Sequence, residues 1–139
     1  MKQKTLIIIK PHAIEHSGSI WAILKNNGFG ILTVKKVQFP IKLAEHLHFI
    51  QQEFKPVSDF KQSGECMIAI LEKENAIRDS LKIAGNRNPT YAEAGTIRAL
   101  FASPDLYAQT GSENTIHVSD CEETAELEIQ LLYNEYSDL

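Results

Sequence analysis

Cysteine is scarce in this sequence, with two residues among 139, Cys66 and Cys121. Neither has a neighbouring cysteine, and the pair has no metal-ligand spacing. A chain of this length buries roughly two-thirds of the surface that its unfolded form exposes, so it needs no disulfide or metal ion to fold. The sequence therefore predicts two free thiols in a reducing compartment.

Long apolar runs and an excess of positive charge are also lacking. The apolar-leaning run after Lys4 ends at Ile9, which is too short for the core of a signal peptide or for a membrane span. A net charge of −4 and a pI near 5.7 argue against a general nucleic-acid-binding surface, because such surfaces depend on clustered Lys and Arg. We expect a cytoplasmic protein without a nucleic-acid or membrane partner, in which a few well-placed cations can still hold a small anion.

Three common functional motifs are absent. The sequence has no Gly-x-x-x-x-Gly-Lys-Ser/Thr phosphate loop, no Gly-x-Gly-x-x-Gly and no His-Glu-x-x-His. A nucleotide enzyme of the common loop-and-lysine type is therefore not expected. The sequence also has no internal repeat, low-complexity tract or inter-domain linker, so we expect one domain over residues 1–139.

Apolar periodicity predicts alternating strands and helices. The continuous run at 5–9 is typical of a central strand that is covered on both faces. Between 84 and 95 the periodicity fails, which in a compact domain indicates a functional or mobile loop. Ser103 and Pro104 are typical of an N-cap and the first position of a short helix. Further strands are expected at 31–39, 66–71 and 115–117, and further helices at 17–27, 43–54, 74–81, 96–100 and after residue 119.

Four strands with intervening helices predict an α+β fold. Its simplest form is the ferredoxin-like arrangement, a four-stranded antiparallel sheet with the helices packed on one face. Because that fold serves many functions, the activity has to be inferred from a site.

His117 and the helix after it form the main candidate site. His117 ends a short β-prone run, and Ser119 and Asp120 are typical N-cap residues for the helix that follows. Glu128 borders the apolar stripe of this helix, where it can hold one imidazole nitrogen while the other faces a pocket. The alternative is a surface histidine next to an ordinary capped helix.

Four other polar residues lie at predicted strand ends or in the irregular loop: Lys10, Arg87, Arg98 and Asn114. Lys10 directly follows the first strand, where an ammonium group suits a phosphate. A solvated strand end is the alternative for this lysine, and each of the four is a weak signal by itself.

Three ordered motifs make the sequence resemble the nucleoside diphosphate kinase family. They are Ile8-Ile9-Lys10-Pro11-His12-Ala13, then Asn88-Pro89 with Ala94-Gly95-Thr96-Ile97-Arg98, and Asn114-Thr115-Ile116-His117-Val118-Ser119-Asp120. The resemblance spans residues 4–133. The last motif is highly specific, because it carries the asparagine, the histidine and the Ser-Asp pair at the family's spacing, with the supporting glutamate at Glu128.

The resemblance implies a ping-pong phosphoryl transfer. A nucleoside triphosphate would give its terminal phosphoryl group to His117, which would pass it to a nucleoside diphosphate of any common base. Mg²⁺ is expected to arrive on the nucleotide phosphates, because the sequence offers no all-protein cage for it. A homo-oligomer is also implied, either a tetramer or a hexamer built from a common dimer.

The resemblance also assigns roles to individual residues. Lys10 and Arg98 would neutralise the phosphates, and Asn114 would hydrogen-bond the ribose and phosphate end. Glu128, together with Ser119, would orient the imidazole.

The sequence departs from the family's pattern at positions that face the nucleotide and at the position after the histidine. Phe49 takes the place of a tyrosine, Leu81 of an arginine and Arg87 of a threonine, while Val118 replaces the glycine after the histidine. We interpret Arg87 as supplying the guanidinium that Leu81 lacks. The alternative is an unrelated surface arginine.

The segment at 55–63 is shorter than in the family, where it supplies the aromatic ring that stacks on the base. Phe54 and Phe60 are the two candidates, and the sequence does not choose between them. Two other functions stay open at this stage. One is a nucleotide-binding or interaction module with weak or no turnover, and the other is a ferredoxin-like regulatory domain for another small ligand.

Overall fold

The computed structural model describes residues 2–38, 64–111 and 113–135 of the chain. The predicted helix at 43–54 lies outside these residues, and so do Phe49, Phe54 and Phe60. Within the described residues, no helix is both long and apolar enough to cross a bilayer.

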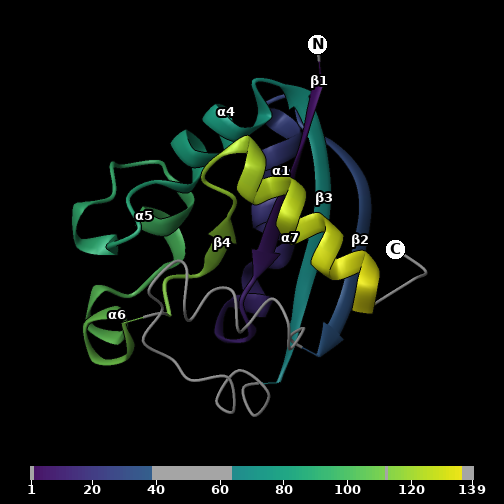
Figure 1. The fold of residues 1–139 in the computed structure, drawn as a ribbon. Coiled ribbons are helices and arrows are strands. Elements are labelled where there is room, and N and C mark those ends of the chain that lie inside the picture. Colours follow the sequence, from purple (N-terminus) through teal and green to yellow (C-terminus); the bar gives the residue numbers. More distant parts are fainter. Residues whose placement is uncertain (1, 39–63, 112, 136–139) are drawn as a thin grey trace.

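The described strands form a four-stranded sheet in the order β2-β3-β1-β4, with every neighbouring pair antiparallel (Figure 1). This order confirms the predicted ferredoxin-like fold. Ile8 at the centre of the sheet lies opposite Ile68 of β3 on one side and His117 of β4 on the other. The strands are β1 Lys2–Ile9, β2 Gly30–Gln38, β3 Glu65–Glu74 and β4 Ile116–Val118.

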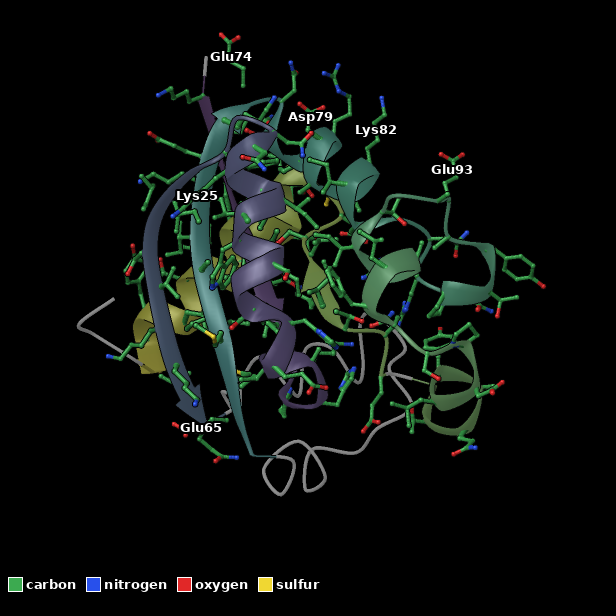
Figure 2. The ribbon with its side chains drawn as sticks, turned by 180° about the vertical axis from the view of Figure 1, so that it is seen from behind. Lys25, Glu65, Glu74, Asp79, Lys82 and Glu93 are labelled. Carbon is green, nitrogen blue, oxygen red and sulfur yellow. The ribbon has the colours of Figure 1, made fainter. Side chains whose placement is uncertain are left out.

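Helices cover both faces of the sheet, so the expectation of helices on one face was wrong. Ile7 and Ile9 of β1 pack in the same core as α1 and α4, whereas Leu6 and Ile8 point the other way and pack with Leu132 of α7. Figures 1 and 2 show α7 and α1 on opposite sides of the sheet. The reason is that β1 is apolar at successive positions, so both of its faces must be removed from water. These helices are α1 Ser17–Asn26, α4 Ala76–Ala84 and α7 Glu122–Glu135.

Shorter helices connect these elements. Two of them, α5 and α6, lie beyond β4 at that edge of the sheet (Figure 1). Ser103 caps α6 as predicted, since its hydroxyl accepts a hydrogen bond from the N–H of Leu106 at 3.2 Å. The short helices are the 3₁₀ helices η1 Pro11–His16 and η2 Pro89–Tyr91, and the α-helices α5 Ile97–Phe101 and α6 Pro104–Thr110.

Two predicted helix starts were wrong. The strand β3 continues to Glu74, and Asn75 with φ 56° makes the turn into α4, which therefore begins at Ala76 and not at Glu74. Neither Ser119 nor Asp120 caps α7. The helix begins at Glu122, and the N–H of Thr124 donates to the Sγ of Cys121 at 3.4 Å, so the thiol takes the capping position.

An ion pair ties α4 to β3. Lys73 Nζ lies 2.6 Å from Asp79 Oδ2, and the Nε–H of Arg78 donates to Asp79 Oδ1 at 3.1 Å. The hydrogen bond from Lys73, followed by that from Arg78, lowers the pKa of Asp79. Figure 2 shows Asp79 and Lys82 on α4 at the end of the molecule opposite Glu65. This pair fixes the helix that leads into the loop of the candidate site.

Candidate active site

His117 lies in the middle of β4 and points at a carboxylate on α7. Its Nε2 is 2.9 Å from both Oε1 and Oε2 of Glu128. The hydroxyl of Ser119 donates to Oε1 of the same carboxylate at 2.5 Å. His117 is 3% exposed and Glu128 is fully buried, so the alternative of a surface histidine is wrong.

Glu128 lies within the buried face of α7, deeper than the border position that the sequence predicted. Its neighbours on that face, Ala125 and Leu132, are buried as well. A buried carboxylate is costly unless donors satisfy it, and His117 and Ser119 supply them. Ser119 therefore orients Glu128 instead of capping the helix.

This geometry decides which imidazole nitrogen can react. A carboxylate only accepts hydrogen bonds, so Nε2 of His117 carries a proton and donates it to Glu128. The other nitrogen, Nδ1, makes no hydrogen bond to any described residue. In the neutral ring Nδ1 then holds a lone pair, and the contact with Glu128 fixes the orientation of the ring.

Lys10 and Asn114 are joined at the segment that leads into β4. The Nζ of Lys10 donates to Oδ1 of Asn114 at 3.1 Å, and Nδ2 of Asn114 donates to the backbone carbonyl of Arg87 at 2.8 Å. Lys10 and Asn114 are 3% and 1% exposed, so the alternative of a solvated strand end for Lys10 is wrong. The chain of hydrogen bonds connects the end of β1, the loop after α4 and the segment before β4.

Arg98 holds the loop against β4. Its NH1 donates to the carbonyl of Gly85 and its NH2 to the carbonyl of Ile116, each at 2.9 Å. The guanidinium is buried next to the residue that precedes His117. Its positive charge therefore lies at the backbone of β4, and two of its donors fix that backbone and the loop.

The backbone between Asn114 and His117 is strained. Thr115 has φ 85°, and the N–H of Ile116 donates to the carbonyl of Asn114 at 3.1 Å. A hydrogen bond between residues two apart with positive φ at the centre is the γ-turn of the rare type, which is unfavourable for a β-branched residue. Sequence reasoning missed this turn, because Thr-Ile-His reads as ordinary strand.

Gly85 is a second position that sequence reasoning missed, although glycine in the irregular loop was the available signal. It has φ 87°, and a Cβ there would lie 2.4 Å from Oγ1 of Thr96. Thr96 caps α5 by accepting from the N–H of Ala99 at 3.3 Å. Glycine thus allows the loop to pass close to the helix that carries Arg98.

The remaining predicted residues lie at the periphery, in the core or outside the described residues. Arg87 joins the group through its backbone carbonyl, and its side chain is exposed. Leu81 is 37% exposed and lines a hollow of about 350 Å³ together with Gly85 and Tyr91. Val118 is buried in the core. Phe49 lies outside the described residues.

Comparisons with known proteins place this geometry in a family. A family model described as nucleoside diphosphate kinase matches residues 3–137. The chain belongs to the nucleoside diphosphate kinase family. A nucleoside diphosphate kinase of Geobacter sp. (strain M21) is 37% identical, with 96% of each chain covered, and one of Methanocaldococcus jannaschii is 35% identical, with 97% of this chain and 96% of the relative covered.

Solved structures agree with this assignment. The nucleoside diphosphate kinase of Aquifex aeolicus superposes with a TM-score of 0.80 at 30% identity, over 95% of both chains. Membership in the nucleoside diphosphate kinase family confirms the resemblance inferred from the three motifs. It also removes the alternative of an unrelated ferredoxin-like regulatory domain, because the similarity extends over nearly the whole chain.

Proposed function

We propose that this chain is a nucleoside diphosphate kinase that works through a phosphohistidine at His117. The proposal is based on the contact between His117 and Glu128. In this contact Nε2 of the imidazole is bound to the carboxylate, and Nδ1 carries the lone pair. A phosphotransferase needs such a nucleophile only if the phosphoryl group rests on the protein between two substrates.

The chemistry follows from this pair. The lone pair on Nδ1 attacks the terminal phosphorus of a nucleoside triphosphate in line with the bond to the leaving diphosphate, which breaks and takes the electron pair. The proton on Nε2 stays with the ring, and the Glu128 carboxylate stabilises the positive charge that develops there. A second nucleoside diphosphate then attacks the phosphorus, and the imidazole leaves with its lone pair restored.

Lys10, Arg98 and Asn114 are the residues that we assign to the substrate. The ammonium of Lys10 is already oriented by Asn114, so it loses less side-chain entropy when it meets the phosphates. Arg98 adds a second fixed positive charge beside β4. Phosphoryl transfer depends mainly on such positioning and charge neutralisation.

Magnesium belongs to the substrate in this proposal. Within the described residues, no group of three or more His, Cys, Asp or Glu converges on one point. Mg²⁺ commonly keeps several waters and binds through substrate phosphates, so the magnesium–nucleotide complex is the species that we expect to bind.

Arg87 is proposed to replace the guanidinium that is missing at Leu81. Both belong to the segment that runs from α4 into the loop, and the carbonyl of Arg87 is fixed by Asn114. Phe49 lies in the part of the chain that is not described, and there it would offer the phosphates no hydroxyl. These departures favour weaker nucleotide binding than a chain with the family's full set of donors would have.

We further propose a single-domain subunit of a cytoplasmic homo-oligomer, a tetramer or a hexamer. The strand β2 is an edge of the sheet that the described residues form, and Leu32 and Val34 on it are 48% and 41% exposed. An edge strand with exposed apolar side chains favours association with another chain. Both cysteines are free thiols, which suits the cytoplasm. Sedimentation analysis distinguishes the two assembly sizes from a monomer.

Initial-rate kinetics test the proposed mechanism. The concentrations of magnesium–ATP and of an acceptor nucleoside diphosphate are varied together. A phosphohistidine intermediate then gives parallel double-reciprocal lines, because the first product leaves before the second substrate binds. Intersecting lines would mean direct transfer in a ternary complex. No turnover, with nucleotide binding retained, would favour the module that binds nucleotides without catalysis.

A further inference from the structure

His12, a residue to which neither the motifs nor the proposed mechanism gives a role, touches the strained turn of the site. The backbone N–H of Thr115 donates to Nε2 of His12 at 3.0 Å, across 103 positions of sequence. On the other side of Thr115, the N–H of Lys10 donates to its carbonyl at 2.9 Å. The segment after β1 thus holds both peptide groups of Thr115.

The turn at Thr115 needs such support. A β-branched residue with φ 85° is in an unfavourable conformation, which persists only where the surroundings determine it. Thr115 is fully buried, and its Oγ1 makes no hydrogen bond to any described residue. The threonine side chain therefore gives the turn no polar anchor, and the backbone contacts with Lys10 and His12 have to supply it.

The turn sets the relative direction of two site residues. Asn114 immediately precedes Thr115, and His117 follows two positions later. Asn114 is directed at Lys10, and His117 is directed at Glu128. If Thr115 relaxed to negative φ, the path of the chain between these two side chains would change, and with it the direction of the imidazole relative to Lys10 and Asn114.

The chemistry of the contact specifies the state of His12. A backbone N–H can only donate, so Nε2 of His12 must accept and carries no proton. Glutamine has an acceptor oxygen as many bonds from Cα as Nε2 of histidine is. The acceptor of asparagine is one bond closer to Cα, and leucine has no acceptor.

We propose that His12 is a positioning residue of the active site, which holds the γ-turn at Thr115 through an unprotonated Nε2 and thereby aligns Asn114 with His117. The inference rests on the proposed function for its kinetic test. The hydrogen bond itself can be tested without it.

The first measurement is NMR spectroscopy of the wild-type chain with ¹⁵N labelling. A scalar coupling between the Thr115 amide and an unprotonated Nε2 of His12 is the expected result. Absence of the coupling in the folded protein would overturn the proposal, whether or not the protein is a kinase.

The second measurement is the single-turnover rate constant for phosphorylation of His117 by saturating magnesium–ATP in three variants. His12→Leu is expected to lower this rate constant by about tenfold or more, because a buried donor is left unpaired and the turn relaxes. His12→Gln is expected to restore it to within about twofold of wild type. His16→Leu is the matched control, since His16 lies in the same η1 helix, stacks on Phe101 and makes no hydrogen bond to Thr115.

The rate constant separates positioning from stability. Loss of folded protein lowers the amplitude of labelling but leaves a first-order rate constant unchanged, so a merely structural role for His12 would change only the amplitude. An unchanged rate constant in His12→Leu, or an equal loss in His12→Gln, would overturn the proposal. If His12→Leu does not fold, His12→Asn replaces it and is expected to be slow for the same reason. A wild type that takes no label would refute the proposed function and leave the NMR result to decide on the contact.

Discussion

Both carboxylate oxygens of Glu128 lie 2.9 Å from Nε2 of His117, and one of them also accepts the hydroxyl of Ser119. The arrangement fixes the imidazole in the tautomer with its lone pair on Nδ1. It joins β4 to α7 across the buried face of the helix, so the same contact serves stability and the proposed chemistry.

Replacing Glu128 with Gln is expected to reduce the rate of His117 phosphorylation by about tenfold, because a neutral hydrogen bond replaces a charge-assisted one and differs from it by roughly 1 to 1.5 kcal/mol. Glu128→Ala should be worse, since it leaves two buried donors unpaired. Single-turnover labelling with magnesium–ATP measures both. Equal rates in wild type and Glu128→Gln would show that the charge of Glu128 does not assist the transfer.

Arg87→Thr tests the proposed replacement of the lost guanidinium. We expect triphosphate affinity to fall by about tenfold or more, since a hydrogen bond to a charged group contributes roughly 1.5 to 3 kcal/mol. Only the side chain is tested, because the contact from Asn114 reaches the backbone carbonyl of Arg87 and survives the substitution. Lys25→Thr on α1 is the control for net charge. Calorimetric titration that gave the same affinity for Arg87→Thr and wild type would refute the compensation.

Gly85→Ala is expected to destabilise the fold by about 3 kcal/mol and to weaken nucleotide binding. Its φ of 87° and ψ of −179° suit glycine alone, and a Cβ would meet Thr96 at 2.4 Å. Gly95→Ala is the matched control, because Gly95 has φ 88° but a Cβ there would meet nothing within 4 Å. It should cost only about 1 to 2 kcal/mol, from backbone strain. Urea unfolding measures both, and equal losses would show that the contact with Thr96 is unimportant.

The sequence predicted the sheet and most helices, because apolar periodicity reports which faces must be buried. It did not predict where the second helix layer lies, although the unbroken apolar run of β1 already required cover on both faces. It also misjudged the start of α7. A Ser-Asp pair is a good local cap, but Ser119 is used by Glu128, a contact that only the tertiary fold determines.

Within the candidate site, the contact between His117 and Glu128 could be predicted from the sequence, and the backbone geometry before His117 could not. The position of His117 in a short β-run and the period of α7 pointed to Glu128. No local pattern indicates the γ-turn at Thr115 or its contact with His12, because both depend on packing between segments that lie about a hundred residues apart. Strained turns of this kind are expected at functional sites, where local preference and fold disagree.

The two cysteines should differ sharply in reactivity. Burial raises the pKa of the Cys66 thiol from 9.0 to about 12, whereas Cys121 is exposed. Iodoacetamide at pH 8 is expected to modify Cys121 alone in the folded chain and both residues after unfolding, because the thiolate is the reactive form. Mass spectrometry gives the stoichiometry. Modification of Cys66 in the folded protein would contradict its burial in the core.

The same thiol predicts a pH dependence of stability. The pKa of Cys66 is higher in the folded chain than in the unfolded chain, so the neutral thiol stabilises the folded state. This stabilisation is complete below pH 9. This contribution is lost as the pH rises from 9.0 to about 12. The difference in free energy of unfolding between wild type and Cys66→Ala should therefore shrink across that range. A constant difference would argue against the raised pKa.

The most direct test of the central claim is incubation of the pure protein with gamma-labelled ATP and magnesium, followed by a chase with a different nucleoside diphosphate. Phosphoryl transfer through His117 predicts acid-labile label on wild type, none on His117→Ala, and complete release of the label as the new triphosphate during the chase. Absence of label on wild type at millimolar nucleotide, or equal label on His117→Ala, would contradict phosphoryl transfer through His117.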